Sequence, residues 1–244
     1  MAYITVFKRN ELKYLLTEEQ CRRVMAAIAP YMEADAYGRT TIRNVYYDTD
    51  TYRLIRHSIE KPAFKEKLRL RSYAEVTEDG TVFAEIKRKY HGTVYKRRLP
   101  LTEREATAWL SGERPPGLHG QIASEIDYFI SYYETLAPRV FLSYEREAYF
   151  EREGTMRVTF DRTVLARCEA LSLREGIFGT PLLPEGTVLM ELKCAGGMPL
   201  FMAKLLSREE IRKTSFSKYG TAYTTLIFSH SEVPSYAGSV SRHL

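Results

Sequence analysis

The sequence has few features of a disulfide-rich, zinc-binding or membrane-spanning protein. It contains only three cysteines, Cys21, Cys168 and Cys194, which lie far apart, form no CxxC pair and have no histidine-rich neighbourhood. We therefore expect neither a disulfide framework nor a zinc site. No apolar run approaches the ~20 residues of a membrane-spanning helix, and the N-terminus lacks the apolar segment of a signal peptide. These absences together predict a cytoplasmic protein.

The composition argues against a largely disordered chain and leaves the type of partner open. Hydrophobic residues make up 44% and charged residues 27% of the 244 residues, which is enough apolar material for a core. Tyrosine is abundant, with 18 residues against one tryptophan, and aromatic residues favour strands. The net charge of +5 and the pI near 9.0 indicate an anionic partner only if the positive charges are concentrated in one place.

One domain is expected for a chain of this length, since all-β barrels often use such a length as a single unit. We place this domain at residues 1–228. Residues 229–244 contain several Ser, Gly and Pro-type helix breakers, so they are predicted to form a flexible C-terminal tail.

Alternating apolar and polar residues predict strands along most of the chain. Turn signals separate the stretches, and Asp79-Gly80 between two alternating runs is a strong hairpin signal. Residues 48–60 are grouped with the strands and not with the helices. The other predicted strands cover residues 1–16, 42–47, 64–74, 82–90, 94–101, 139–151, 155–167 and 188–194.

Two capping boxes mark the starts of predicted helices. Thr17 with Gln20 precedes apolar residues at helical spacing, and Thr102 with Glu105 opens a shorter helix that ends at Leu110. Further helices are predicted at residues 121–136, 199–206 and 217–228. The chain thus combines many strands with several amphipathic helices that need apolar surfaces to cover.

Charged residues recur at every second position in several predicted strands. Because side chains two apart point to the same face of a strand, each such series forms one charged row. The opposite face of the strand at 64–74 is apolar, with Phe64, Leu68 and Leu70. The rows contain Glu11 and Lys13; Lys65, Lys67, Arg69 and Arg71; Glu85, Lys87 and Lys89; Lys96 and Arg98; and Glu191 and Lys193.

A single charged row in an antiparallel sheet ordinarily faces water. Here the rows fall on at least five strands, and the helices require apolar sheet faces. If the helices pack outside a barrel, the apolar faces point outward and the charged faces point into the lumen. Enclosed like charges would repel one another and lose solvation, so they require a polyanion such as a chain of phosphates. We therefore predict an α+β fold with a closed antiparallel β-barrel and helices packed on its outside.

The few carboxylates on the charged rows suggest a metal site. Glu11, Glu85, Asp161 and Glu191 lie among the cations. One or two carboxylates combined with phosphate oxygens is the usual arrangement for Mg²⁺ or Mn²⁺. The alternative is that these carboxylates only form ion pairs with the neighbouring lysines. From this pattern Glu191, Glu11 and Glu85 are candidate metal ligands.

Several short motifs occur in an order and spacing that are specific as a set. They are Arg9-Asn10-Glu11-Leu12-Lys13-Tyr14, Val45-Tyr46-Tyr47-Asp48-Thr49, Lys67-Leu68-Arg69-Leu70-Arg71, Glu85-Ile86-Lys87-Arg88-Lys89, Tyr144-Glu145-Arg146-Glu147-Ala148-Tyr149-Phe150, Arg157-Val158-Thr159-Phe160-Asp161, Glu191-Leu192-Lys193 and Ser217-Lys218-Tyr219. With these motifs the chain resembles the catalytic domain of the vacuolar transporter chaperone (VTC) polyphosphate polymerases. That family belongs to the triphosphate tunnel metalloenzyme (CYTH-like) superfamily, and the resemblance spans nearly the whole chain.

The resemblance implies a tunnel whose basic side chains hold the triphosphate of ATP or the growing polymer beside a divalent metal, Mn²⁺ or Mg²⁺. The implied catalytic residues are Arg69, Arg71, Lys87, Arg146, Arg157 and Glu191. The implied substrate-binding residues are Lys13, Lys67, Lys89, Lys96, Lys193, Ser217 and Lys218. Glu191 is the implied metal ligand, with Glu11 and Glu85 as the further candidates named above.

The chain departs from the family in two respects. Eukaryotic members carry a basic residue two places before the Ser-Lys pair, whereas here that position is Ser215 and the nearest cation is Lys213. The phosphate-sensing and membrane-spanning domains of the eukaryotic subunits are also not recognised, so we expect a free-standing, microbial type. A membrane-protein partner and the oligomeric state are left open by the sequence.

The function predicted from these features is polyphosphate synthesis from ATP. Phosphoryl transfer requires in-line positioning and charge neutralisation, which Arg, Lys and a metal supply without a protein nucleophile. A triphosphate hydrolase of the same superfamily is the first alternative. The second is a non-catalytic module that binds polyphosphate or RNA, in which Tyr90 and Tyr95 would stack bases. Glu191 argues against that module, and no nucleic acid is expected as a partner.

Other residues that could carry chemistry are given ordinary structural roles. His57, His91 and His119 lie in no motif and are expected in loops or at the surface. Tyr46 and Tyr144 are predicted to pack or stack. Cys194 lies on the outward face of its strand and is predicted to be a small core residue. No catalytic role is predicted for these histidines, tyrosines or Cys194.

Overall fold

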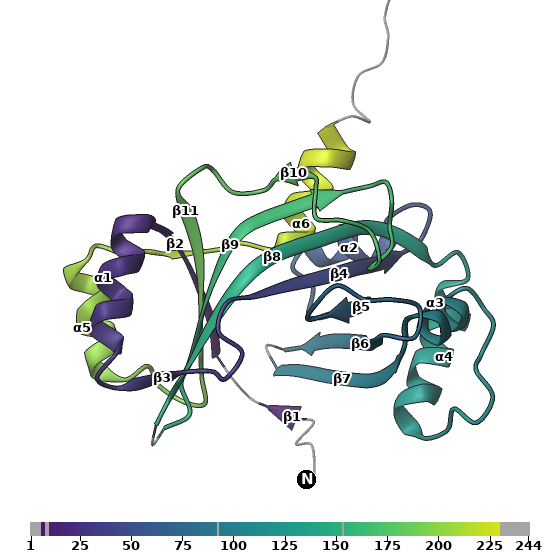
Figure 1. Ribbon diagram of the computed structural model, residues 1–244, viewed down its shortest axis with the longest axis horizontal. Coiled ribbons are helices and arrows are strands. Elements are labelled where there is room, and N and C mark those ends of the chain that lie inside the picture. Colours follow the sequence, from purple (N-terminus) through teal and green to yellow (C-terminus); the bar gives the residue numbers. More distant parts are fainter. Residues whose placement is uncertain (1–5, 8–9, 92, 153, 230–244) are drawn as a thin grey trace, which may run out of the picture.

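The computed structural model describes residues 6–7, 10–91, 93–152 and 154–229, and its strands form one large antiparallel sheet (Figure 1). The predicted α+β class is confirmed. Arg9 of the first motif and residues 230–244 of the predicted tail lie outside the described residues. The division into one domain and a tail therefore stays a prediction.

Strands outnumber helices in the described part of the chain, and the helices lie in the connections between strands or follow the last strand. The strands are β1 (Val6–Phe7), β2 (Asn10–Thr17), β3 (Met32–Ala34), β4 (Thr40–Asp48), β5 (Phe64–Ser72), β6 (Thr81–Tyr90), β7 (Thr93–Thr102), β8 (Ala137–Glu151), β9 (Arg157–Arg167), β10 (Thr180–Pro181), β11 (Thr187–Cys194) and β12 (Lys213–Thr214). The helices are α1 (Glu18–Ile28), α2 (Arg53–Ile59), α3 (Glu103–Leu110), α4 (Gln121–Tyr133), α5 (Leu200–Arg208), α6 (Lys218–Ala222) and the π-helix η1 (Tyr223–Phe228). Among the described residues, no helix is both long and apolar enough to cross a lipid bilayer.

The sheet is not closed by hydrogen bonds within the described residues. Its strand order is β1-β7-β6-β5-β4-β8-β9-β11-β2-β12, with β10 added to β9 and β3 added to β8. No described strand pair joins the β1 end to the β12 end, so the antiparallel sheet is confirmed but its closure into a barrel is not shown.

The two ends of the sheet nevertheless come together through side chains. The ammonium of Lys87 on β6 lies 3.5 Å from a carboxylate oxygen of Glu11 on β2. Strands β6 and β2 are far apart in the strand order, so this contact requires the sheet to curl with these side chains inside. Figure 1 shows the curvature, since β2 and β11 run crosswise to β5, β6 and β7. We call the enclosed side the inner face.

Local signals explain where α1 and α3 begin. The hydroxyl of Thr17 accepts a hydrogen bond from the backbone N–H of Gln20 at 3.1 Å, and the Gln20 side chain accepts one from the Thr17 N–H at 3.0 Å. Thr102 and Glu105 form the same reciprocal pair at the start of α3. Both predicted capping boxes are therefore confirmed, and each satisfies backbone donors that the first helical turn leaves free.

Helix α2 was not predicted, because its cap is not local. The residue before it, Tyr52, has a left-handed backbone with φ of 57° and gives no side-chain cap. The helix is capped from β4 instead, where the carboxylate of Asp48 accepts hydrogen bonds from the backbone N–H groups of Leu54 and Ile55 at 2.8 and 3.0 Å. A cap six residues upstream does not form a recognisable sequence pattern.

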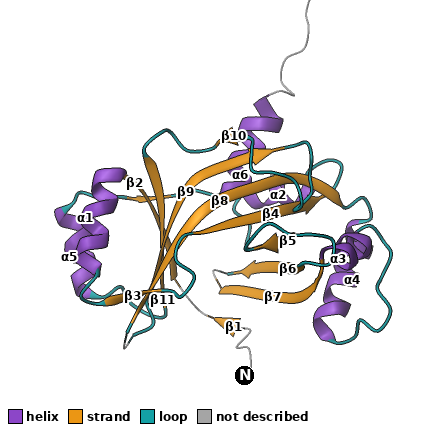
Figure 2. Cartoon of the chain, viewed as in Figure 1, coloured by secondary structure: helices purple, strands orange, loops and turns teal. Residues whose placement is uncertain are grey.

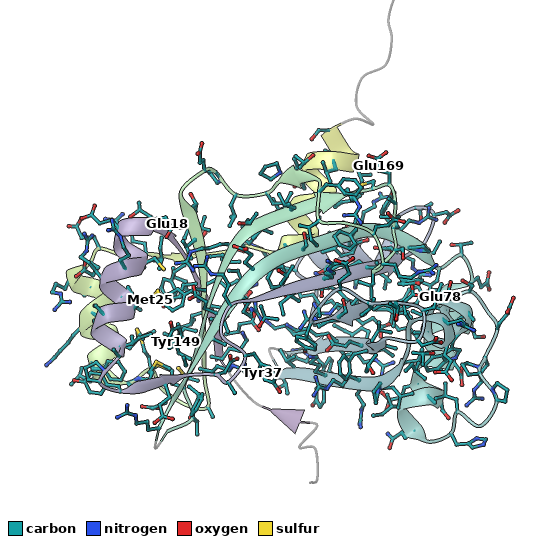
Figure 3. The ribbon with its side chains drawn as sticks, viewed as in Figure 1. Glu18, Met25, Tyr37, Glu78, Tyr149 and Glu169 are labelled. Atoms are coloured by element: carbon teal, nitrogen blue, oxygen red, sulfur yellow. The ribbon has the colours of Figure 1, made fainter. Side chains whose placement is uncertain are left out.

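Helices cover the outer face of the sheet at its two ends (Figure 2). Helices α1 and α5 pack on one end over an apolar cluster that includes Val24, Met202 and the buried Cys194, as predicted for this cysteine. Figure 3 labels Met25 on α1 and Tyr149 on β8, two partly buried side chains that pack against this cluster. Helices α3 and α4 cover the other end, and Trp109 and Phe129 are buried there.

The inner face is only partly charged, which corrects the prediction of a uniformly polar lumen. Ile42, Tyr46 and Val140 lie on this face and form an apolar cluster with Ile55 of α2 and Tyr219 of α6. Helix α6 and the π-helix η1 therefore pack inside the curve of the sheet and not outside it. The apolar part supports the helix, and the charged part of the inner face lies beside it.

Candidate functional site

Charged side chains from seven strands and α6 converge on the inner face. Cross-strand pairing puts Lys67 of β5 opposite Lys87 of β6, and Arg69 opposite Glu85. Residues directly opposite one another share a face of the sheet. We call the resulting set the cage. It consists of nine cations, Lys13, Lys67, Arg69, Arg71, Lys87, Lys96, Arg146, Lys193 and Lys218, and four carboxylates, Glu11, Glu85, Asp161 and Glu191.

Glu85 organises one side of the cage. Its side chain is 1% exposed, and it contacts Arg69 at 2.7 Å, Lys96 at 2.6 Å and Arg71 at 3.7 Å. Burial alone would raise the pKa of Glu85, but these three cations outweigh burial and lower that pKa below its ordinary value. Burial also lowers the pKa of Lys96 to about 8, despite the opposing charge of Glu85. Glu85 therefore stays ionised and holds three cations in place.

Asp161 and Glu191 organise the other side. The Asp161 carboxylate accepts hydrogen bonds from Arg146 at 2.6 and 2.7 Å and from the Lys218 ammonium. Glu191 contacts Lys193 at 2.9 Å, Lys218 at 3.3 Å and Lys13 at 3.4 Å. Burial opposes ionisation of Glu191, yet Lys218 and its other cationic neighbours hold the pKa well below the usual value.

Glu11 connects this side to the far end of the sheet. Its two carboxylate oxygens lie 3.5 Å from the ammonium groups of Lys13 and Lys87. Burial would raise the pKa of Glu11, but Lys87, Lys193 and Lys13 lower it to about 2 against burial and the repulsion of Glu191. Glu11 is therefore a carboxylate at neutral pH and belongs to the same charge network as Glu191.

Lys67 is the cage cation with the least compensation. Its ammonium donates to the Ser217 hydroxyl at 3.4 Å and lies 5.7 Å from the centre of the Tyr219 ring. No described carboxylate lies within 4.0 Å of it. Burial lowers the pKa of Lys67 to about 8, and the neighbouring Lys87 and Lys13 act in the same direction. The Lys67 ammonium is therefore available to form an ion pair with an added anion.

Tyr46 and Tyr144, which were predicted to pack or stack, also hold two arginines of the cage in place. The Tyr46 hydroxyl accepts a hydrogen bond from Arg69 at 2.8 Å, and its ring stacks on Tyr219 with centroids 4.6 Å apart. The Tyr144 hydroxyl accepts one from Arg71 at 3.2 Å. Burial would raise the pKa of Tyr46, but Arg69, Lys67 and Arg71 lower it to about 8. The sequence placed Tyr46 in a family motif, but its contact with Arg69 could be found only from the strand register, in which the two residues lie opposite one another.

Tyr144 also joins the two sides of the cage. The Lys218 ammonium and the Arg146 guanidinium lie 4.5 and 5.0 Å from the centre of its ring. Arg71, which its hydroxyl holds, belongs to the Glu85 side. A bound anion that reaches Arg71 is therefore next to Arg146 and Lys218 as well.

Two of the predicted site residues stand apart from the cage. Arg157 lies on the inner face at the rim, with a half-exposed side chain that contacts Asp35 at 3.4 Å. Lys89 is exposed near the end of β6. The predicted Ser217 lies at the N-cap of α6, where its hydroxyl accepts from the Gly220 N–H at 3.2 Å. Its contact with Lys67 puts it at the edge of the cage.

Lys213 does not take the place of the family's missing basic residue. It pairs with Tyr14 in the register of β12 and β2, and it is exposed. Tyr14 contributes to the outer core, so Lys213 faces away from the cage. The neighbouring Lys13 instead donates to the backbone carbonyl of Phe216 at 2.9 Å, which ties β2 to the start of α6.

Only some of the cage carboxylates are suited to bind a metal ion. In the described residues no group of three or more His, Cys, Asp or Glu side chains could hold an ion by itself. The oxygens of Glu85 already face Arg69 and Lys96, so Glu85 does not fit a metal ligand. Glu11 and Glu191 both contact Lys13, and two carboxylates suit a divalent ion that takes its remaining ligands from phosphate.

Comparison with solved structures shows the fold. A candidate adenylate cyclase from Bacillus halodurans is 15% identical with a TM-score of 0.55, covering 88% of this chain and 96% of that one. A candidate adenylyl cyclase from Hippeastrum with a dominant triphosphatase activity is 14% identical with a TM-score of 0.52, covering 88% and 94%. No curated protein is similar enough in sequence to count as a match.

Comparison with protein families gives a match over most of the chain. The model of the VTC domain matches residues 8–227, which include all the strands and helices from β2 to α6 and every residue of the cage. The sequence motifs, the curved sheet with its basic inner face and this match agree. The chain therefore belongs to the VTC domain family.

Proposed function

We propose that this chain is a polyphosphate polymerase that transfers the γ-phosphate of ATP to the end of a polyphosphate chain held in the cage. The observation that carries the proposal is the convergence of nine cationic side chains with only four carboxylates on one enclosed face. Such an excess of positive charge on an enclosed face favours the binding of a polyanion. The proposal includes closure of the curved sheet into a tunnel and a cytoplasmic location, where ATP is available.

The arginines supply the contacts that the transferred group requires. Arg69, Arg71 and Arg146 are each held by a carboxylate or a tyrosine hydroxyl, so their planar forks are oriented before a substrate binds. A fixed guanidinium binds two phosphate oxygens at once and does not lose its proton. In the reaction, an oxygen of the terminal polymer phosphate forms a bond to the γ-phosphorus, and the bond to the bridging oxygen of ADP breaks. The leaving electron pair stays on ADP.

The lysines and the carboxylates complete the arrangement. Lys13, Lys67, Lys96 and Lys193 would neutralise the oxygens of the polymer and the triphosphate, and Lys87 and Lys218 would position them. A divalent ion, Mn²⁺ or Mg²⁺, would be held by Glu191 and Glu11 together with phosphate oxygens and would supply further positive charge. Glu85 orients Arg69, Arg71 and Lys96 in this scheme and binds no metal. Arg157 and Lys89 would contact the polymer at the rims.

The test is incubation of the purified protein with ATP and Mn²⁺, followed by separation of the products on a gel. Long phosphate chains together with ADP support the proposal. Orthophosphate and ADP without chains would indicate that water is the acceptor, as in a triphosphate hydrolase. Binding of polyphosphate without any turnover of ATP would indicate a non-catalytic module.

A further inference from the structure

A second hollow lies beside the cage, between α2, α4 and the start of β5. It has a volume of about 530 Å³, in the range of small-ligand sites. Arg53 and His57 of α2 and Lys65 of β5 line it, together with tyrosines of α4. A smaller hollow of about 240 Å³ shares Arg53 and His57 and adds Arg56 and Glu60. Both hollows thus lie along α2.

Lys65 connects this cavity to the cage. It lies two residues before Lys67 on β5, in the same row of the strand, and its ammonium donates to the backbone carbonyl of Ser58 at 3.2 Å. Burial lowers the pKa of Lys65, and Lys89, Lys61 and Lys87 act in the same direction. Several ammonium groups therefore lie within electrostatic reach of one another at this end of β5 and β6.

The positive charge here is only partly compensated, because Glu60 contacts His57 and leaves the nearby cations without a carboxylate partner. Among the described residues, no carboxylate lies within 4.0 Å of the charged groups of Arg53, Lys65 or Lys89. The one carboxylate that lines the larger cavity, Glu66, is occupied by Arg88 at 2.9 Å and by the Tyr133 hydroxyl at 2.8 Å. At the opposite rim, by contrast, Arg157 is paired with Asp35. The two ends of the inner face are therefore electrostatically different.

The lining favours an extended anion over a compact one. The Arg53 guanidinium is fixed 5.5 Å from the ring centres of both Tyr132 and Tyr133. Tyr128 and Tyr132 are exposed, so their hydroxyls are accessible at the cavity wall. Lys67 and Lys65 share one face of β5, Lys65 and Arg53 line the larger cavity, and Arg53 and Arg56 line the smaller one. A linear chain of phosphates matches such a series.

We propose that a polyphosphate chain held in the cage leaves it past Lys67 and Lys65 and continues through the cavity along α2. This cavity would be an extension site for phosphates beyond the reacting ones. That the polyphosphate is made in the cage rests on the proposed function, whereas the binding of polyphosphate in the cavity does not. The chemistry recognised is a linear polyphosphate, with no requirement for a nucleobase.

The test compares a short and a long anion on the full chain. Tripolyphosphate is short enough to occupy the cage alone, whereas long-chain polyphosphate would also fill the cavity. We expect the double variant Arg53→Glu with Lys65→Glu to bind long-chain polyphosphate about tenfold more weakly, equivalent to about 1.4 kcal/mol. Its affinity for tripolyphosphate should change by less than about twofold, which also shows that the cage is folded. The slope of affinity against salt should fall by about 0.7 per lost contact.

The matched control is Arg22→Glu with Lys204→Glu, two exposed cations on α1 and α5 that change the net charge equally. An equal loss of long-chain affinity in this control would overturn the inference, because general charge would then explain it. A parallel loss of tripolyphosphate affinity in the test variant would also overturn it, because the cavity would then be part of the cage. If the protein makes no polymer from ATP but retains the long-chain preference, the proposed function fails and the extension site stands.

Discussion

Replacement of Glu85 by Gln tests whether the cage needs a polyanion to be stable. Glu85 is buried and contacts Arg69, Arg71 and Lys96, so Glu85→Gln leaves three cations without their carboxylate. Removal of one partner from a buried ion pair costs about 3–5 kcal/mol. Gln keeps one oxygen acceptor, so we expect the lower value, about 3 kcal/mol. For a chain of this size each kcal/mol lowers Tm by about 2–4 °C, which predicts a decrease of about 6–12 °C.

Added anion should reverse much of this loss. Tripolyphosphate at about 100 times its Kd stabilises a folded protein by about 2.7 kcal/mol, and it should bind the uncompensated cations of the variant more strongly than those of the wild type. Thermal unfolding is therefore measured at pH 7 with and without tripolyphosphate. The gap in Tm between variant and wild type should shrink to less than half when the anion is present.

Glu125→Gln provides the matched control. Glu125 also contacts two arginines, Arg88 at 2.8 Å and Arg97 at 3.2 Å, but on the outer side of the sheet. Its substitution should lower Tm by less, and tripolyphosphate should stabilise it no more than the wild type. If Glu85→Gln leaves Tm unchanged, or if the anion stabilises both variants equally, the idea of a cage that awaits a polyanion is refuted.

Three further predictions concern the cage. Burial lowers the pKa of Lys67 and of Lys96 to about 8, so tripolyphosphate binding measured by calorimetry should weaken as the pH rises from 7 to 9. In the unfolded chain these lysines keep their protons up to the ordinary lysine pKa of 10.5, so the ligand-free protein should become more stable as the pH rises from 7 to 9. If stability and tripolyphosphate affinity both decreased over this interval, the lowered pKa values of Lys67 and Lys96 would be contradicted. Glu191→Ala should abolish the conversion of ATP to polymer while polyphosphate affinity stays within a few-fold of the wild type, and undiminished turnover on the gel assay would exclude Glu191 from metal binding. Tyr46→Phe removes the hydroxyl that accepts from Arg69, and it should weaken tripolyphosphate binding by about tenfold, since a hydrogen bond to a charged group contributes about 1.5 kcal/mol or more; an unchanged affinity would show that Glu85 alone orients Arg69.

The inner face was predictable because it depends on alternation within single strands. Lys67, Arg69 and Arg71 share a face in any regular strand, and Glu85 and Lys87 follow the same rule on the next strand. The capping boxes were predictable for a similar reason, since both partners lie within one helical turn. Sequence pattern is reliable where the interacting groups are close in the chain.

The parts that were missed depend on contacts outside a single strand or helical turn. The cap of α2 comes from β4, and the apolar half of the inner face is explained only by the position of α6 inside the sheet. Closure of the sheet would depend on pairing between the two ends of the strand order, which alternation within one strand does not reveal. The orientation of Lys213 likewise depends on its register with Tyr14. Alternation cannot provide such information, because a one-residue change of register reverses the face.

The four carboxylates of the cage resolve an apparent conflict between stability and binding. A cage of cations alone would repel itself in the absence of substrate, whereas a fully neutral one would bind phosphate weakly. Here Glu85, Asp161 and Glu191 each hold two or more cations, so the side chains are already oriented in the free protein. Lys67 remains without a carboxylate, and it is the member of the cage that lies next to Lys65 on the same face of β5. An incoming phosphate chain would therefore pair first with Lys67 and then share the cations that the carboxylates hold.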